Sequence, residues 1–276
     1  MEIRFTKMQG LGNDFVLFDA LVSPIVLSPD QIRRVADRRY GVGCDQVLLI
    51  EPARRPGADV RYRIFNADGG EVEHCGNGSR CVARYLLEEK LSKGEHVVVE
   101  TVNGMIRMDC EADGQVRVDM GPPRFAPQDI PMQVANQANT YELEVDGQRV
   151  TIHALSMGNP HAVMRVDAVA AAPVGRLGPL IATHRLFPEG ANAGFMEVVD
   201  RACIRLRVYE RGVGETPACG TGACAAVVAG RLQGLLDEKV EVELPGGFLS
   251  IRWEGDGASV WMTGPAVRVF EGRIQL

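Results

Sequence analysis

The feature that most constrains the fold of this 276-residue chain is an internal repeat. Residues 60–78 (VRYRIFNADGGEVEHCGNG) align without a gap on residues 204–222 (IRLRVYERGVGETPACGTG). Seven of the nineteen positions are identical, and they include the cysteine of each copy, Cys75 and Cys219. Two shorter matches are collinear with this one: Gly12-Asn13 with Gly158-Asn159, and Gly121-Pro122 with Gly264-Pro265. The chain therefore contains one structural unit twice.

Two long copies predict two similar domains, because a solenoid needs at least three short repeats. A chain of this length can bury two cores of about 120 residues each. We expect an N-terminal domain over residues 1–122 that carries Cys75, and a C-terminal domain over residues 149–265 that carries Cys219. A linker is expected at about 123–148, and the last strand, 266–276, is a candidate to return to the N-terminal domain.

Local signals predict few helices and many short strands. Ser28 and Pro29 indicate a helix start, and that helix should run to Asp37. Two further helices are predicted after glycine-rich turns, near 79–90 and 222–236, and a weaker one over about 175–184. Residues 96–121 alternate between apolar and polar and carry Asn-Gly and Asp-Gly turns, which indicates an antiparallel meander. The predicted class is α+β, with two pseudo-symmetric domains, each a barrel-like, mostly antiparallel sheet around a central helix.

Composition excludes several classes of function. The chain has 30 Lys+Arg against 36 Asp+Glu, a formal charge of −6 and a pI near 5.5, whereas nucleic-acid-binding domains carry a basic excess. No apolar run approaches the 18 residues of a membrane span, and the N-terminus lacks the apolar stretch of a signal peptide. Seven cysteines, an odd number in a long chain, favour free thiols in the cytoplasm over a disulfide framework.

Cys75 and Cys219 both precede a Gly-x-Gly segment that opens a predicted helix. The backbone N–H groups of residues 76–79 and 220–223 are then the unpaired donors of two helix N-termini, which bind carboxylates. A helix N-terminus also lowers the pKa of a nearby thiol. One thiolate and one thiol on opposite faces of a ligand supply the base and the acid that racemisation or epimerisation requires.

Other uses of these cysteines remain open at this point. The spacings from Cys75 to Cys81 and from Cys219 to Cys224 fit structural zinc poorly. A cysteine hydrolase needs a basic partner, for which His74 or His161 could serve, but it does not explain the duplication. No clustered ligands indicate a metal and no lysine indicates pyridoxal phosphate, so we expect an enzyme without a cofactor.

Several motifs resemble those of the diaminopimelate epimerase family. They are MQGLGNDF (8–15), NADGG (66–70) followed by CGNGSR (75–80), MGNPH (157–161) and ERGVGETPACGTG (210–222). The resemblance runs from about residue 3 to the end of the chain. One departure is Gly70, where the family usually has serine.

The resemblance implies an isomerase that interconverts LL- and meso-2,6-diaminopimelate in lysine and cell-wall precursor synthesis, acts without a cofactor and forms a homodimer. Cys75 and Cys219 are implied as the acid/base pair, with His161 and Glu210 near the reacting amine. The α-carboxylate is implied to bind at Gly76, Asn77, Gly220 and Thr221. The distal end of the substrate is implied to contact Asn13, Asn66, Asn159, Asn192 and Arg211, with Gln46 close by.

Two rival functions stay open on the sequence. A proline or hydroxyproline racemase also uses two opposed cysteines, but a proline ring offers no partner for Arg211 and the asparagines. A non-catalytic module that only binds an amino acid is the second rival, and it gives the paired cysteines no purpose. A guanidinium and several amides suit a longer substrate with two charged ends.

Overall fold

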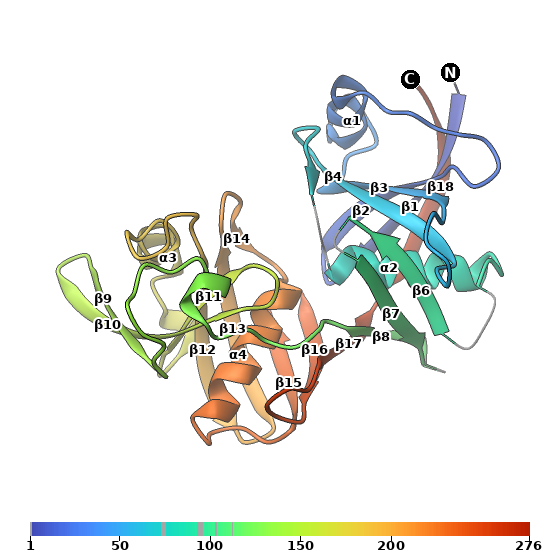
Figure 1. The fold of residues 1–276 in the computed structure, drawn as a ribbon. Coiled ribbons are helices and arrows are strands. Elements are labelled where there is room, and N and C mark those ends of the chain that lie inside the picture. Colours follow the sequence, from blue (N-terminus) through green and yellow to red (C-terminus); the bar gives the residue numbers. More distant parts are fainter. Residues whose placement is uncertain (1, 73–75, 93–95, 103, 112) are drawn as a thin grey trace. The chain divides into compact units, whose positions relative to one another are not determined.

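The fold consists of two compact units (Figure 1). The computed structural model describes residues 2–72, 76–92, 96–102, 104–111 and 113–276. Unit 1 comprises residues 1–119 and 263–276, and unit 2 comprises residues 120–262. In the described part of the chain no helix is long and apolar enough to cross a membrane.

Unit 1 holds eleven complete elements within the described ranges. They are β1 (Glu2–Gly10), β2 (Asn13–Asp19), α1 (Pro29–Ala36), β3 (Gln46–Pro52), β4 (Val60–Asn66), β5 (Glu71–Val72), α2 (Gly76–Glu88), β6 (His96–Thr101), β7 (Gly104–Cys110), β8 (Gln115–Asp119) and β18 (Val267–Gln275). The last of these, β18, is antiparallel to β1.

Unit 2 follows the same order after a short lead-in. Its elements are η1 (Pro127–Asp129), β9 (Tyr141–Val145), β10 (Gln148–Ser156), β11 (Pro160–Arg165), η2 (Val169–Ala171), α3 (Val174–Ala182), β12 (Asn192–Asp200), β13 (Cys203–Glu210), β14 (Gly214–Thr216), α4 (Gly220–Leu232), β15 (Lys239–Leu244) and β16 (Gly247–Trp253), while β17 (Val260–Pro265) spans the boundary between the units.

Strand pairing repeats from one unit to the other. In unit 1, β2 runs parallel to β3 with Phe15 opposite Gln46, and in unit 2, β11 runs parallel to β12 with His161 opposite Asn192. Strand β4 pairs with β5 and β6, and β13 pairs with β14 and β15 in the same senses. The two units are therefore pseudo-symmetric, and each sheet mixes parallel pairs into a mostly antiparallel arrangement.

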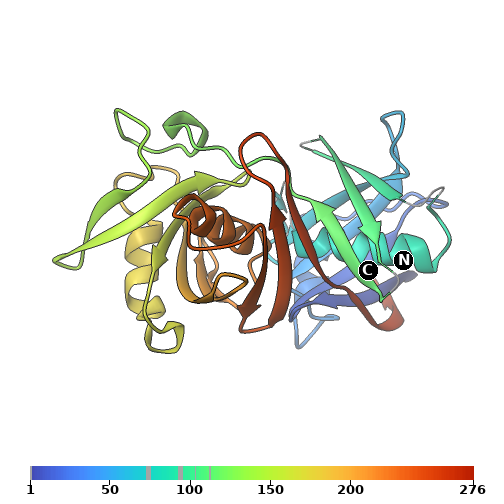
Figure 2. The same cartoon turned by 90° about the horizontal axis from the view of Figure 1, so that it is seen from below.

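A buried helix lies inside each sheet. Helix α4 contacts β10 to β13 and β16, and ten of its thirteen residues are buried (Figure 2). Helix α2 contacts β1, β7, β8 and β18 of its own unit. Both helices begin earlier than predicted, at Gly76 and Gly220, because the glycines assigned to the turns form the first helical turn.

The repeated arginines and glutamates form matching ion pairs. Arg63 donates Nε and Nη2 to the two carboxylate oxygens of Glu71, both at 2.7 Å. Arg207 makes the same fork to Glu215 at 2.6 and 2.9 Å. Each fork joins the strand before the cysteine loop to the short strand after the turn, which accounts for two of the seven identities in the repeat.

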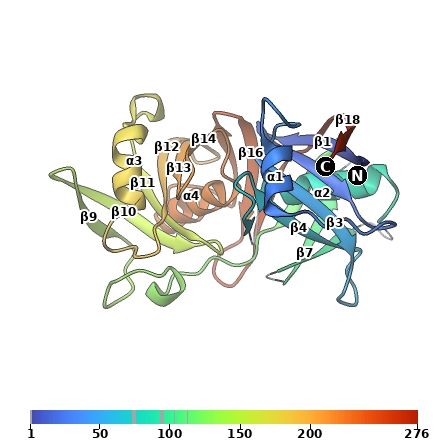
Figure 3. The ribbon, with the colours of Figure 1, turned by 90° about the horizontal axis from the view of Figure 1, so that it is seen from above.

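An outer helix covers the sheet of each unit (Figure 3). Helix α1 starts at the predicted cap, where Ser28 accepts from the N–H of Gln31 and the Gln31 side chain accepts from the N–H of Ser28. Its Ile32 and Val35 pack into a core with residues of β2 and β3. Helix α3 contacts β12 and β13, and Pro179 lies inside it.

The segment 123–148, expected as a linker, contains regular structure. Its strand β9 pairs with β10 from Val145 opposite Gln148 to Tyr141 opposite Ile152. Asp146 and Gly147 both have positive φ, at 52° and 73°, as a two-residue hairpin turn requires. The compact second unit accordingly begins at residue 120 rather than 149.

Candidate active site

Cys219 occupies the N-cap of helix α4 and is 4% exposed. Its carbonyl accepts the first helical hydrogen bond, from the N–H of Ala223 at 2.9 Å. Its Sγ lies 3.7 Å from Oγ1 of Thr221 and also takes a hydrogen bond from the N–H of Gly222. A Cβ added at Gly222 would lie 3.2 Å from this sulfur. Glycine at 222 therefore leaves room for the thiol above the helix start.

The pKa expectation is wrong for Cys219. The sequence predicts a lowered thiol pKa at a helix N-terminus, but burial and the negative charge of Glu210 raise the pKa of Cys219 well above its ordinary value. Hydrogen bonds from Thr221 and Gly222 act in the opposite direction and are outweighed. A thiol with these surroundings and no bound ligand holds its proton at neutral pH.

Glu210 lies at the end of β13 and hydrogen-bonds to the Cys219 thiol. Burial raises the pKa of Glu210, and the bonds from Thr216 and Cys219 lower it in part. The Thr216 hydroxyl donates to Oε1 of Glu210 at 2.5 Å. Thr216 was not among the residues singled out from the sequence, because a strand hydroxyl three positions before a cysteine carries no distinctive signal.

A chain of hydrogen bonds connects His161 to the same helix start. Asn159 donates Nδ2 to Oγ1 of Thr221 at 3.3 Å, and its Oδ1 lies 3.0 Å from Nε2 of His161. His161 is 1% exposed, and burial together with the positive charge of Arg211 lowers its pKa to about 3. The imidazole is therefore neutral near pH 7, and its bond to an acceptor oxygen places the hydrogen on Nε2.

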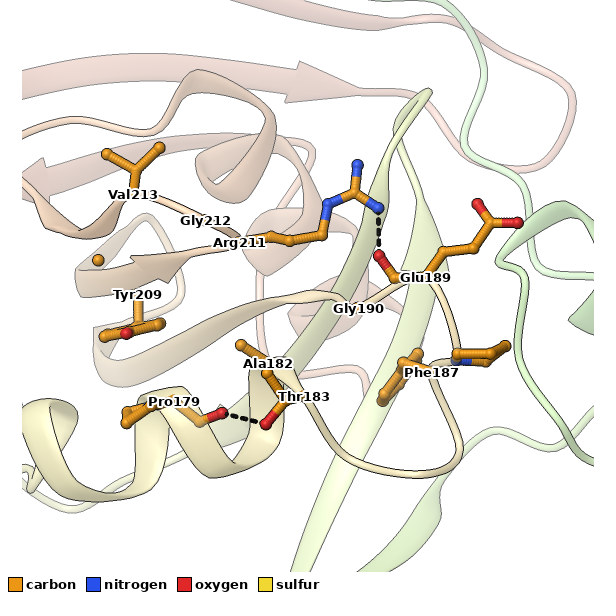
Figure 4. A pocket seen from close by; sticks show the side chains of 12 residues that line it. Pro179, Ala182, Thr183, Phe187, Glu189, Gly190, Tyr209, Arg211, Gly212 and Val213 are labelled. Carbon is orange, nitrogen blue, oxygen red and sulfur yellow. Dashed lines mark hydrogen bonds between the residues drawn. The ribbon is translucent and has the colours of Figure 1, made fainter. Parts of the chain in front are cut away.

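Arg211 is held by the loop before β12 (Figure 4). Its backbone N–H donates to Oδ1 of Asn192 at 2.8 Å, and its Nη1 donates to the carbonyl of Glu189 at 2.6 Å. Its alkyl stem passes over Gly190, where an added Cβ would lie 2.8 Å from Cδ of Arg211. The stem also borders a cavity of about 510 Å³ between α3 and the turn 211–214.

Four of the site residues predicted from the sequence form two hydrogen-bonded pairs in unit 1. Asn77, in the first turn of α2, donates Nδ2 to Oδ1 of Asn13 at 3.2 Å. Gln46 donates Nε2 to Oδ1 of Asn66 at 2.8 Å, across the β3–β4 pairing. Cys75 and His74 lie outside the described residues. At Gly70, where the family usually has serine, an added Cβ would lie 3.1 Å from Oδ1 of Asp68.

The structure also contains a polar partner that the sequence reasoning missed. Asp45 precedes Gln46 and accepts a hydrogen bond from Nδ2 of Asn13 at 2.9 Å. A carboxylate in a loop looks like an ordinary solvated residue in a sequence, so only the folded chain reveals this contact. Among the described residues, no group of three or more His, Cys, Asp and Glu side chains is arranged to hold a metal ion.

Comparison with solved structures supports the two-unit fold. A PhzF-family phenazine biosynthesis protein from Bacillus anthracis aligns over 100% of both chains, with a TM-score of 0.70 and 18% identity. A probable proline racemase from Agrobacterium radiobacter aligns over 99% of this chain and 93% of its own, with a TM-score of 0.69 and 19% identity. Likeness at this level of identity concerns the fold alone.

Sequence comparison identifies the family. A profile of the family described as diaminopimelate epimerase matches residues 5–126 and 153–269, which include both cysteines. The diaminopimelate epimerase of Alkalilimnicola ehrlichii is 61% identical over 278 aligned positions, covering 100% of both chains. The chain belongs to the diaminopimelate epimerase family.

Proposed function

We propose that this protein interconverts LL- and meso-2,6-diaminopimelate without a cofactor, with Cys75 and Cys219 as a base and an acid on opposite faces of the α-carbon. The observation that carries the proposal is the full-length identity of 61% to a protein of that name. The buried cysteine at the start of α4 supports it, because Cys75 occupies the same place in the repeat.

The proposed reaction moves one proton on each face of the α-carbon. A thiolate takes the α-proton, so that an S–H bond forms as the C–H bond breaks and the electron pair stays on the substrate. The carboxylate shares this charge and lies against the N–H groups of Gly76, Asn77, Gly220 and Thr221, which are fixed before the reaction begins. The opposite thiol then gives its proton to the other face.

The two cysteines have unequal neighbours in the repeat. Glu210 corresponds to Asn66 in the alignment of the two copies, so the carboxylate that raises the pKa of Cys219 has a neutral amide as its counterpart. We therefore assign the role of acid in the resting enzyme to Cys219, and the proposed two-base reaction leaves the role of base to Cys75. Glu210 accepts a hydrogen bond from the Cys219 thiol. The neutral imidazole of His161 lies near the reacting amine in this proposal.

The distal end of the substrate carries an ammonium and a carboxylate. Arg211 suits the carboxylate, because a guanidinium can bind it through two parallel hydrogen bonds. Asn13, Asn66, Asn159 and Asn192 supply amides that donate and accept. Gln46 supports this assignment, because its Oε1 is buried and has no hydrogen-bond partner among the described residues. An ammonium group of the substrate can donate a hydrogen bond to this oxygen.

A proline racemase is the second candidate, favoured only by the shared fold. Proline has a single carboxylate and no distal charge, which leaves Arg211 unused.

We also infer a cytoplasmic homodimer, as the family resemblance implies. Light scattering during size-exclusion chromatography tests the dimer, and a mass near 30.0 kDa, that of one chain, contradicts it.

Conversion of LL-diaminopimelate tests the proposed function. The purified, reduced protein should yield an LL/meso mixture, resolved by chiral chromatography, and Cys75→Ala and Cys219→Ala should each abolish the conversion. A matched control is Cys224→Ala, which changes a buried cysteine in α4, five residues after Cys219. Failure of the unsubstituted protein with diaminopimelate, together with racemisation of proline, would move the protein to the second candidate.

A further inference from the structure

The Asn13 side chain is fixed from both sides within unit 1. Asp45 accepts from its Nδ2 at 2.9 Å, and Asn77 donates to its Oδ1 at 3.2 Å. A carboxylate can only accept hydrogen bonds, so Asp45 determines which end of the Asn13 amide faces it. The amide oxygen is thereby directed toward the first turn of α2.

Asp45 is itself held in place by a compact ion cluster. Arg38 donates Nη2 to Oδ1 of Asp45 at 2.7 Å and forms a two-pronged pair with Asp14 at 2.8 and 3.0 Å. The N–H of Asp45 donates to Oδ1 of Asp14, and the N–H of Asp14 donates to Oδ2 of Asp45. Lys7, 7% exposed, donates to Asp14 at 2.6 Å and to the carbonyl of Gly43.

The cluster keeps the carboxylate of Asp14 ionised, and therefore able only to accept hydrogen bonds. Burial alone raises the pKa of Asp14, but hydrogen bonds from Arg38 and Lys7 outweigh it and hold that pKa well below the ordinary value. Two positive and two negative side chains balance one another. The cluster therefore contributes geometry to Asn13 rather than net charge.

Pseudo-symmetry shows that this cluster belongs to unit 1 alone. The strand pairings of the two units superimpose when Phe15 is matched with His161 and Gln46 with Asn192. In that alignment Lys7 corresponds to Ala154, Asp14 to Pro160 and Asp45 to Ala191. The corresponding positions in unit 2 are therefore apolar.

The matched asparagines consequently point their amides in opposite directions. Asn159 turns its Nδ2 toward Thr221, whereas Asn13 turns its Oδ1 toward Asn77, the residue that matches Thr221 in the repeat. The two asparagines thus present different groups at equivalent places, and in unit 1 the choice is made by Asp45.

We propose that Asp45 is a positioning residue for substrate binding, which acts by locking the amide of Asn13 with its oxygen toward α2. The proposal rests on the proposed function, in which Asn13 contacts the distal end of diaminopimelate. Without Asp45 the amide can rotate and exchange its donor with its acceptor. Substrate affinity then falls, while the proton transfer at the α-carbon keeps its groups.

Steady-state kinetics with LL-diaminopimelate test this role. Asp45→Ala should raise KM about tenfold, the equivalent of one charge-assisted hydrogen bond, and leave kcat within about threefold. Asp45→Asn should largely restore KM, because its amide oxygen can still accept from Asn13. The matched control is Glu243→Ala. The side chains of Glu243 and Asp45 are 42% and 43% exposed, and each forms an ion pair with an arginine. The control should keep the unsubstituted KM.

A double-mutant cycle separates positioning from general stability. If Asp45 acts through Asn13, the double variant Asn13→Ala/Asp45→Ala should have the KM of Asn13→Ala alone. Asp45→Ser, too short to reach Asn13, replaces the alanine variant should that variant not fold. An unchanged KM in folded Asp45→Ala or Asp45→Ser, or additive effects in the cycle, would overturn the inference alone. An unsubstituted protein that does not convert diaminopimelate overturns the proposed function as well.

Discussion

At the scale of single residues, the Cys219 environment sets the chemistry of the site. The thiol is buried at a helix start and is hydrogen-bonded to Glu210 and to the N–H of Gly222. The helix start and its N–H groups favour the thiolate, whereas burial and the adjacent carboxylate favour the thiol. Burial and the carboxylate outweigh the N–H groups, so the thiol of Cys219 is protonated in the resting state.

Replacing the carboxylate should shift this balance. In a Cys75→Ser background, Glu210→Gln removes the negative charge that raises the pKa of Cys219, so the pH midpoint of Cys219 alkylation should move downward. Mass spectrometry of the Cys219 peptide after brief iodoacetamide treatment measures the midpoint. Glu215→Gln, which changes an exposed carboxylate five residues further along the chain, is the control. A midpoint that stays in place or rises contradicts the assigned role of Glu210.

Gly190 determines where the Arg211 side chain lies. Its φ of 75° disfavours other residues, and a Cβ there would lie 2.8 Å from Cδ of Arg211 and 3.0 Å from the carbonyl of Ala182. Gly190→Ala should therefore displace the guanidinium and raise KM for LL-diaminopimelate about tenfold or more. Gly175→Ala, in α3 with no atom within 4 Å of the added Cβ, should leave KM unchanged. Equal KM values for the two variants would contradict this account.

At the scale of elements, α4 is built from small residues because strands contact it on several sides. Residues Ala223 to Ala229 are all 0% exposed, and the apolar run ACAAVVA in the sequence correctly indicates a helix that is buried all round. Such a helix tolerates no increase in volume, because the sheet around it is hydrogen-bonded and cannot expand locally.

Overpacking this helix should destabilise the protein. Ala226→Leu inserts three carbon atoms at a position with 0% exposure and should lower the free energy of unfolding by about 1–3 kcal/mol. Urea denaturation followed by circular dichroism measures the change. Ala170→Leu, at an exposed position of η2, is the matched control and should change stability by less than about 0.5 kcal/mol. A neutral Ala226→Leu would mean that α4 is loosely packed.

The elements also show how far the sequence could lead. The repeat predicted that β4 and β13 are equivalent strands of the two units, and Ser28-Pro29 located the start of α1 within one residue. The helix starts at Gly76 and Gly220 were predicted two to three residues late, because glycine weakens helix propensity and tertiary packing overrides it here. The roles of Asp45 and Thr216 could not be predicted, because each depends on a partner that only folding brings near.

At the scale of the whole molecule, the duplicated units share a fold but differ in the charged side chains that they hold at equivalent positions. Unit 1 surrounds Asn13 with an ion cluster, whereas unit 2 has apolar residues at the positions that match Lys7, Asp14 and Asp45. His161 corresponds to Phe15 in the strand register, so the second unit buries a titratable ring where the first buries a phenyl ring.

This difference makes stability depend on pH in a defined window. The pKa of His161 is about 3 in the folded protein, against about 6.5 in the unfolded chain. As pH falls below 6.5 the unfolded chain binds the proton first, so the free energy of unfolding should decrease by up to about 1.4 kcal/mol per pH unit. His161→Phe removes this contribution. Urea denaturation at pH 7 and pH 5 should show a loss smaller by about 2 kcal/mol in the variant, and equal losses would contradict a neutral, buried His161.

The central claim is that two opposed thiols move separate protons, and isotope transfer tests it most directly. LL-diaminopimelate is incubated with the reduced, unsubstituted protein in D2O, and early time points are followed by proton NMR and mass spectrometry. A two-thiol mechanism predicts deuterium at the α-carbon of the meso product while the remaining LL substrate keeps its hydrogen, because the donating thiol has exchanged with solvent. Meso product that retains the original hydrogen would show that one group carries the proton across both faces, and would contradict the account.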